Sequence, residues 1–195
     1  MGKVSLGITM SLDGFIAGPN DDIQHLFKWY FSGSVEIPIQ QGRMTLKVAP
    51  ESAAVLDGAM KLNGAMLTGR RNFDVAHAWG GTPPFEPTVV LTHNPPQEWI
   101  KEGSPFIFVT DGIESAIRKA KEAAGDKDIA VATPSVMQQA LKAGLLDEIH
   151  IDLVPVLLGQ GTRLFEYLGI EPLELEIVEI VPAPGVTHMT YRVKK

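Results

Sequence analysis

The chain has 195 residues, of which 45% are apolar and 21% charged, and its formal net charge at pH 7 is −6. This length fits a single domain with or without an insertion, and the composition is that of a globular protein with a buried core. Only 17 side chains are basic and they form no long run, so the sequence gives no support for nucleic-acid binding. The absence of cysteine excludes disulfides, thiolate metal sites and cysteine nucleophiles, and it fits a reducing cytoplasm.

Two further classes of protein have no support in the sequence. No apolar stretch reaches the roughly 20 residues that a membrane span requires, and Val4 to Met10 alternates like a strand rather than a signal peptide. The histidines show no ligand spacing, so a metal site is not expected. They are His25, His77, His93, His150 and His188. We expect a soluble cytoplasmic protein that binds neither membranes nor metals.

The first quarter of the chain has a mixed pattern. Residues 4–10 predict a strand, and residues 11–21 predict a loop rich in glycine, proline and asparagine. Residues 22–31 place apolar side chains at helical spacing and predict a helix. Residues 32–50 have no convincing period and contain several glycines and prolines, so we expect an inserted, mobile loop there.

The remainder alternates between helices and strands. The predicted helices are 52–62, a helix that the capping signal Asp111–Glu114 opens and Gly125 stops, and 135–143. The predicted strands are 65–68, 88–92, 106–109, 128–132 and 148–154. Residues 173–181 and 186–193 form a predicted antiparallel hairpin at the end of the chain. This alternation predicts an α/β fold with a mostly parallel sheet covered on both faces and an antiparallel hairpin at one edge.

The junction Ala132–Val136 joins a strand to a helix through a tight turn, with Thr133 as N-cap and Pro134 as first helical residue. Helix N–H groups at such a junction can bind an anion. A phosphate site usually has glycine here, which lets the backbone approach the ligand. Proline removes one N–H and threonine adds bulk. The Thr133 hydroxyl and the amides of Ser135 and Val136 could still bind an anion.

Three charged residues lie on turns that follow strands. Arg70 and Arg71 come after Gly69 at a strand-to-helix turn, where they are placed to bind phosphate, although solvated surface arginines are about as common. Asp13 lies on a loop beside Gly14. Its carboxylate could hold a substrate or relay a proton, or it could form an Asx-type turn.

Other side chains also allow more than one interpretation. His93 could meet a 2′-phosphate or end a strand. His25, Trp29 and Tyr30 could wall a substrate pocket with stacking surfaces, whereas aromatics at helical spacing more often belong to a core. His150 alternates within a strand, as a packing or surface residue does.

Five stretches together resemble the dihydrofolate reductase-like superfamily. They resemble more closely its branch that contains the riboflavin-biosynthesis reductase, the C-terminal domain of the deaminase-reductase. The stretches are Met10–Pro19, Leu67–Arg71, Val89–Thr92, Gly144–Glu148 and Pro155–Gly161 with Leu164 and Phe165. They occur in the family's order and span nearly the whole chain.

The resemblance implies a single dihydrofolate reductase-like domain over residues 1–195, built as a three-layer α/β/α sandwich. It implies an NADPH-dependent reductase that binds NADPH across the carboxyl ends of the sheet, and a homodimer. By motif, Ile16 and Ala17 would line the nicotinamide pocket. The phosphates would lie against Gly69, Arg70 and Arg71, the adenosine end against Leu91, Thr92 and His93, and the pyrophosphate against Ala132, Thr133, Ser135 and Val136.

The sequence departs from the family at two places. The family's pyrophosphate turn carries paired glycines where this chain has Ala132-Thr133-Pro134, and the buried acid of folate reductases has no clear equivalent, so folate reduction is not inferred. We predict an NADPH-dependent reductase that transfers a hydride to a C=N or C=O group of a small heterocyclic or carbonyl substrate. The alternative is a non-catalytic binding or interaction protein that keeps the fold with a degenerate cofactor site.

Overall fold

The computed structural model describes residues 2–194, which divide into two compact units. The parallel unit comprises residues 2–6 and 61–147, and the antiparallel unit comprises residues 7–60 and 148–194. Strand β1 (Val4–Ser11) begins in the parallel unit and continues into the antiparallel unit.

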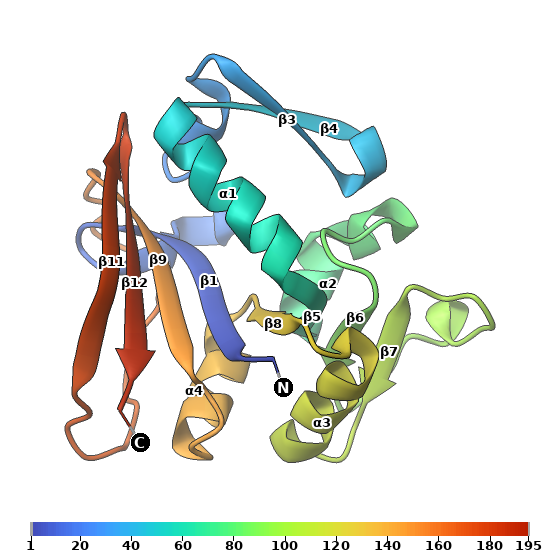
Figure 1. The fold of residues 1–195 in the computed structure, drawn as a ribbon. Helices are drawn as coiled ribbons and strands as arrows, with labels where there is room; N and C mark the ends of the chain where they lie inside the picture. Colours follow the sequence, from blue (N-terminus) through green and yellow to red (C-terminus); the bar gives the residue numbers. More distant parts are fainter. Residues whose placement is uncertain (1, 195) are drawn as a thin grey trace. The chain divides into compact units, whose positions relative to one another are not determined.

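The parallel unit is built on a sheet whose hydrogen-bonded order is β1-β8-β5-β6-β7 (Figure 1). Its strands after β1 are β5 (Asn63–Gly69), β6 (Thr88–Leu91), β7 (Phe106–Val109) and β8 (Asp128–Val131). Every neighbouring pair in this order is parallel. The last five residues of β5 are all buried, as expected for a strand covered on both faces.

Helices follow three of these strands, namely α2 (Arg70–Val75), α3 (Ile113–Ala124) and α4 (Pro134–Lys142). The connections β5–α2–β6 and β7–α3–β8 cross the sheet in opposite directions. Because such crossovers are right-handed, α2 and α3 cover opposite faces of the sheet. Helix α3 also packs against α4. The carboxyl ends of β5, β6 and β8 therefore open at one edge, where α2 and α4 begin.

The antiparallel unit contains the sheet order β11-β12-β9-β1, built from β9 (Glu148–Val154), β11 (Leu175–Ala183) and β12 (Val186–Val193). Two small sheets pair β2 (Phe15–Ala17) with β10 (Thr162–Arg163) and β3 (Val35–Ile39) with β4 (Met44–Val48). Helix α1 (Pro50–Leu62) follows β4. The buried core of this unit comprises Leu26, Trp29, Leu46, Val48, Val154 and Val186.

Short 3-10 helices complete the fold. They are Pro19–Asp21, Lys28–Phe31, Gln40–Gly42, His77–Gly81 and Gln97–Trp99. No helix within residues 2–194 is long and apolar enough to cross a membrane. The same residues contain no cluster of three histidine, aspartate or glutamate side chains that could hold a metal ion.

The expected alternation of strands and helices and the terminal antiparallel hairpin are confirmed. The predicted helix over residues 22–31 is wrong, since only Lys28–Phe31 forms a single 3-10 turn. Ile23 and Phe31 are about half exposed, so the segment buries no continuous helical stripe. Residues 32–50 contain the β3–β4 hairpin rather than an irregular loop. Their mobility and the single-domain organisation stay predictions.

Candidate functional site

The parallel unit brings six of the predicted cofactor residues to one sheet edge. Gly69 ends β5 and is in register with Leu91, the last residue of β6, while Thr92 and His93 follow at once. On the other side of β5, β8 is followed by Ala132 and Thr133, and the Ala132 N–H donates to the carbonyl of Leu67 at 3.0 Å. The six residues are Gly69, Leu91, Thr92, His93, Ala132 and Thr133.

Gly69 lies directly against the turn that begins α4. A Cβ atom at Gly69 would lie 3.4 Å from both the Thr133 Oγ1 and the Ser135 Oγ, and 3.5 Å from the Val136 Cγ2. The glycine therefore brings backbone within reach of two hydroxyl groups. This close approach is the property that a phosphate-binding turn requires of glycine.

The start of α4 has the predicted caps but an unexpected hydroxyl. Thr133 is the N-cap, with φ −142° and ψ 146°, and Pro134 is the first helical residue. The Thr133 side chain makes no capping bond, and its buried Oγ1 has no hydrogen-bond partner among the described residues. The amides of Ser135 and Val136 lie in the first turn, where the helix offers them no acceptor. One buried hydroxyl and two amides therefore form a donor set suited to an anion.

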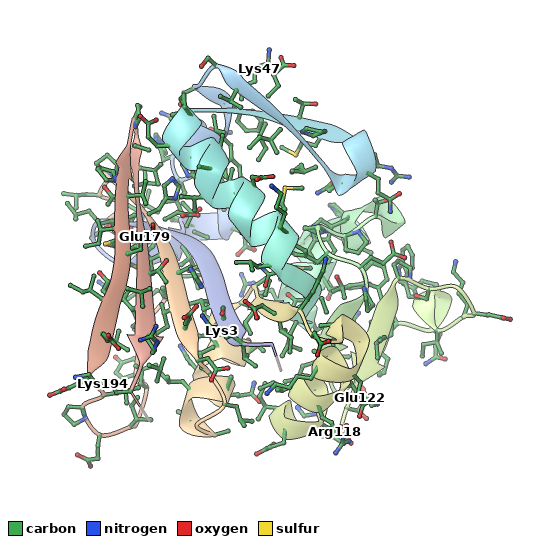
Figure 2. The ribbon with its side chains drawn as sticks, viewed as in Figure 1. Lys3, Lys47, Arg118, Glu122, Glu179 and Lys194 are labelled. Atoms are coloured by element: carbon green, nitrogen blue, oxygen red, sulfur yellow. The ribbon has the colours of Figure 1, made fainter. Side chains whose placement is uncertain are left out.

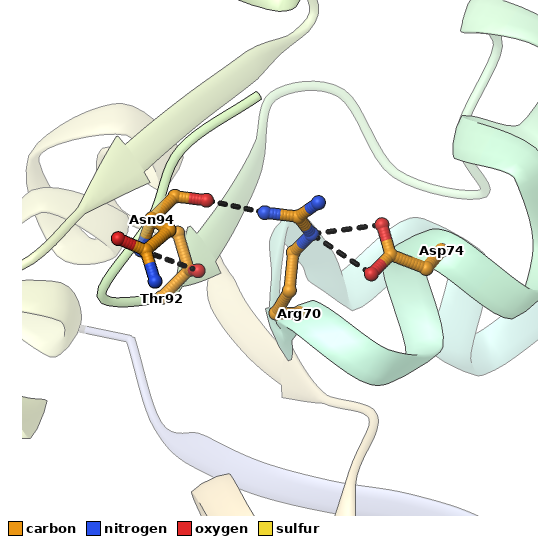
Figure 3. Close-up of polar contacts among 4 residues, drawn as sticks. All are labelled: Arg70, Asp74, Thr92 and Asn94. Atoms are coloured by element: carbon orange, nitrogen blue, oxygen red, sulfur yellow. Dashed lines mark hydrogen bonds and ion pairs between the residues drawn. The ribbon is translucent and has the colours of Figure 1, made fainter. Parts of the chain in front are cut away.

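Arg70 is engaged within the protein itself (Figure 3). Its Nε donates to both carboxylate oxygens of Asp74, at 2.8 and 2.9 Å, and its Nη1 donates to the backbone carbonyl of Asn94. The backbone N–H of Asn94 donates in turn to the Thr92 Oγ1 at 3.2 Å. Arg70 thus connects the start of α2 to the segment after β6. Arg71, which follows Arg70, and His93, which precedes Asn94, are both exposed.

Asp13 organises a turn in the antiparallel unit. Its Oδ1 accepts from the Ser11 hydroxyl at 2.6 Å and from the Leu158 amide at 3.1 Å, and its Oδ2 accepts from the Gly159 amide at 2.7 Å. These bonds, above all the one from Ser11, lower the pKa of Asp13 to about 2. The carboxylate is therefore ionised at neutral pH and accepts three hydrogen bonds, which favours the turn-forming interpretation over proton transfer.

The predicted nicotinamide residues lie beside the same turn. Ile16 is half-buried and Ala17 is buried in β2, which pairs with β10. A Cβ atom at Gly161 would lie 2.0 Å from the Ala17 carbonyl oxygen, so only glycine fits there. Arg163 donates to the Asp13 carbonyl at 3.1 Å, and its guanidinium lies 4.3 Å from the centre of the Phe15 ring.

The two predicted substrate residues differ in exposure. His25 is exposed, whereas Trp29 is only 3% exposed and belongs to the core of the antiparallel unit. For Trp29 the structure thus displays the core packing that was the alternative reading. Their role in substrate binding stays a prediction.

A buried polar chain in the antiparallel unit was missed by the sequence analysis. It consists of Ser52 on α1, His188 on β12 and Asp152 on β9. Burial and the charge of Asp152 raise the pKa of the neighbouring Tyr30 phenol. The available signal was polar residues at inward positions of alternating strands, since Val154 and Val186, two residues away from Asp152 and His188, are core residues.

Comparisons with known proteins agree with this architecture. The model of the RibD C-terminal domain matches residues 2–188. No curated protein matches the sequence. A protein of Shewanella sp. PV-4, described as a riboflavin biosynthesis protein, has a similar structure with a TM-score of 0.76 and 22% identity, covering 100% of both chains.

Two further structures share the fold. The riboflavin biosynthesis reductase Rib7 of Saccharomyces cerevisiae has a TM-score of 0.60 and 12% identity, covering 99% of this chain and 90% of that one. A dihydrofolate reductase from Enterococcus faecalis, complexed with NADP(H), has a TM-score of 0.57 and 15% identity, covering 100% of this chain and 98% of that one. The dihydrofolate reductase-like α/β fold expected from the sequence is confirmed. The chain belongs to the RibD C-terminal domain family.

Proposed function

We propose that the protein is an NADPH-dependent reductase of a small heterocyclic or carbonyl substrate. Membership of the RibD C-terminal domain family supports a reductase, and two proteins of the same fold are described as a riboflavin biosynthesis reductase and a dihydrofolate reductase complexed with NADP(H). The observation that carries the proposal is the buried Thr133 hydroxyl, which has no partner among the described residues and lies at the start of α4 beside Gly69.

The residues at the sheet edge suit the phosphates of the cofactor. The Thr133 hydroxyl and the amides of Ser135 and Val136 would bind the pyrophosphate, with Gly69 permitting its close approach. Arg71 and His93 are exposed and would meet the 2′-phosphate that distinguishes NADPH from NADH. Leu91 and Thr92 would flank the adenosine.

In the antiparallel unit, Ile16 and Ala17 would bind the nicotinamide. Bound NADPH would supply a hydride for reduction of a C=N or C=O group. The protein would orient the reactants and exclude water, and Asp13 would fix the turn beside Ala17 rather than deliver the proton, because its pKa is about 2. We also propose a cytoplasmic location and a homodimer, both on the basis of the family.

The test is a titration of the purified protein with NADPH and NADH, followed by tryptophan fluorescence and thermal shift. A cofactor at 100 times its Kd stabilises the folded state by about 2.7 kcal/mol, which a melting curve detects. We expect saturable binding that favours NADPH. The variants Arg71→Ala and His93→Ala are expected to lower the affinity for NADPH and to leave the affinity for NADH unchanged. Absence of binding by either cofactor up to millimolar concentration would contradict the proposal.

The alternative of a degenerate cofactor site has its own discriminating variant, Thr133→Gly combined with Pro134→Gly. This double change restores the glycine pair that the family has at this turn. A large gain in NADPH affinity would mean that the present turn obstructs the cofactor. If the Thr133 hydroxyl replaces the missing amide, we expect little gain, because one donor is exchanged for another.

A further inference from the structure

His188 lies at the centre of the buried polar chain in the antiparallel unit. Its Nδ1 is 2.6 Å from the Asp152 Oδ1, and its Nε2 is 2.8 Å from the Ser52 Oγ. Ser52 is 1% exposed and His188 4% exposed. Because both ring nitrogens have partners, the orientation of the imidazole is fixed.

The same ring also contacts Trp29. The two ring centroids are 5.2 Å apart with an interplanar angle of 74°, an edge-to-face arrangement that stabilises aromatic pairs. The Trp29 Cβ would lie 3.7 Å from a Cβ atom placed on Gly185, in the turn between β11 and β12. Trp29 therefore packs against the turn that precedes β12 and against the ring of His188.

Residues 30–51 lie in the chain between Trp29 and Ser52, and we name this segment the strap. The strap carries the β3–β4 hairpin (Figure 1). The Gly33 amide donates to the Lys47 carbonyl at 2.7 Å, so the strap is closed at its base. Within the hairpin, Lys47 pairs with Glu36 at 3.0 Å, and Figure 2 labels this lysine. Both side chains are exposed, so the pair adds little stability.

A two-stranded hairpin is marginally stable by itself and depends on what it packs against. The strap contributes Leu46 and Val48 to the core around Trp29. Its two ends are held at one imidazole, by ring contact at Trp29 and by a hydrogen bond at Ser52. Loss of the Trp29 ring contact or of the Ser52 hydrogen bond would therefore destabilise the base of the hairpin, while the sheet of β9 and β12 stays intact.

We propose that His188 is the anchor that fastens both ends of the strap, and that its release lets the strap open and expose Trp29. Asp152 orients the imidazole, and Ser52 ties it to the first turn of α1. This device concerns the antiparallel unit alone. It does not rest on the proposed reductase function, and its test needs no cofactor.

The same three residue types in this hydrogen-bonded order form the catalytic triad of serine hydrolases. Here the serine is 1% exposed, so a substrate carbonyl has no access to its hydroxyl in this structure. Burial therefore favours fastening over nucleophilic catalysis. The two roles are distinguished by treating the native protein with a small organophosphonate reagent, which reacts with an accessible activated serine.

The experiment is hydrogen–deuterium exchange with mass spectrometry on the wild type, Ser52→Ala and His188→Asn. Loss of one hydrogen bond of ordinary strength should accelerate exchange in the segment it holds about tenfold. We expect this acceleration in residues 35–48, with β9 and β12 unchanged, and faster tryptic cleavage after Arg43 and Lys47. His150→Asn is the matched control. His150 lies on β9, two residues from Asp152, and its Nδ1 is 3.0 Å from the Thr190 Oγ1 on β12.

The proposal is overturned if the hairpin exchanges as in the wild type in both variants, or if exchange accelerates equally in β9, β12 and the hairpin. Labelling of Ser52 in the native wild type by the organophosphonate would also overturn it. If His188→Asn does not fold, Ser52→Ala decides alone, since alanine suits a helix and removes only the hydroxyl.

Discussion

Replacing Thr133 by valine should change stability and cofactor affinity in opposite directions. The substitution keeps the branched shape and removes a hydroxyl that is buried without a partner among the described residues. An unsatisfied buried polar group costs about 1–3 kcal/mol. We therefore expect the free energy of unfolding of the cofactor-free protein to rise by about 1 kcal/mol or more.

The same hydroxyl, if it donates to a cofactor phosphate, makes a charge-assisted hydrogen bond worth about 1.5–3 kcal/mol. At about 1.4 kcal/mol for each factor of ten, the Kd for NADPH should rise by about ten- to a hundredfold in Thr133→Val. Thr133→Ser keeps the hydroxyl and should retain most of the affinity. A purely structural threonine would not produce this combination of higher stability and weaker binding.

Urea denaturation without cofactor measures the first effect, and fluorescence titration with NADPH measures the second. Ser5→Ala is the matched control, since the Ser5 hydroxyl is also buried without a partner among the described residues but lies on β1, opposite Ala130 of β8. Its removal should leave the NADPH affinity unchanged. The reasoning is refuted if Thr133→Val destabilises the free protein and binds NADPH as tightly as the wild type.

Three further outcomes are expected. Asp74→Asn removes the carboxylate that engages Arg70, which the family resemblance places against the cofactor phosphates. The freed guanidinium should tighten NADPH binding a few-fold in a titration, and stability should change by less than about 0.5 kcal/mol. The pKa of Asp13, lowered to about 2, implies stability that is present above about pH 4 and lost as the pH falls towards 2, so the melting temperatures of wild type and Asp13→Asn should converge over that range. Gly161→Ala should lower the free energy of unfolding, measured by denaturation, by about 3 kcal/mol, because its Cβ would lie 2.0 Å from the Ala17 carbonyl oxygen in β2. Gly159→Ala, whose Cβ would meet nothing within 4 Å, should lower it by about 1 kcal/mol.

The parallel unit could be predicted from the sequence because its signals are local. Short apolar runs such as Ala65–Leu67 mark strands that are buried on both faces, and α3 carries its buried residues at helical spacing between Gly112 and Gly125. The Thr133 N-cap and the proline after it likewise follow from neighbouring residues. Local patterns therefore locate the strand ends at which the candidate cofactor residues gather.

The antiparallel unit could be predicted only in part because its structure depends on distant contacts. The segment around Leu26 and Trp29 resembles a helix in spacing, but these residues are buried against Val154 and Val186 from the end of the chain. Pro38 lies within β3 and interrupts the strand pattern, which a two-stranded ribbon tolerates at its edge. The polar chain through His188 joins residues 136 and 36 positions apart, so no local motif could predict it.

The turn at the start of α4 illustrates how a departure from a family motif can preserve the chemistry of the motif. Pro134 lacks the amide that a glycine would offer, but its restricted φ suits the first position of a helix. Thr133 places a hydroxyl donor in the same turn and leaves it buried without a partner among the described residues. In a turn with no ligand, that hydroxyl would be an unrelieved cost of about 1–3 kcal/mol, which a capping bond to the first helical turn would remove. Its lack of a partner among the described residues therefore supports our proposal of an anion site at this turn over the alternative of a degenerate one.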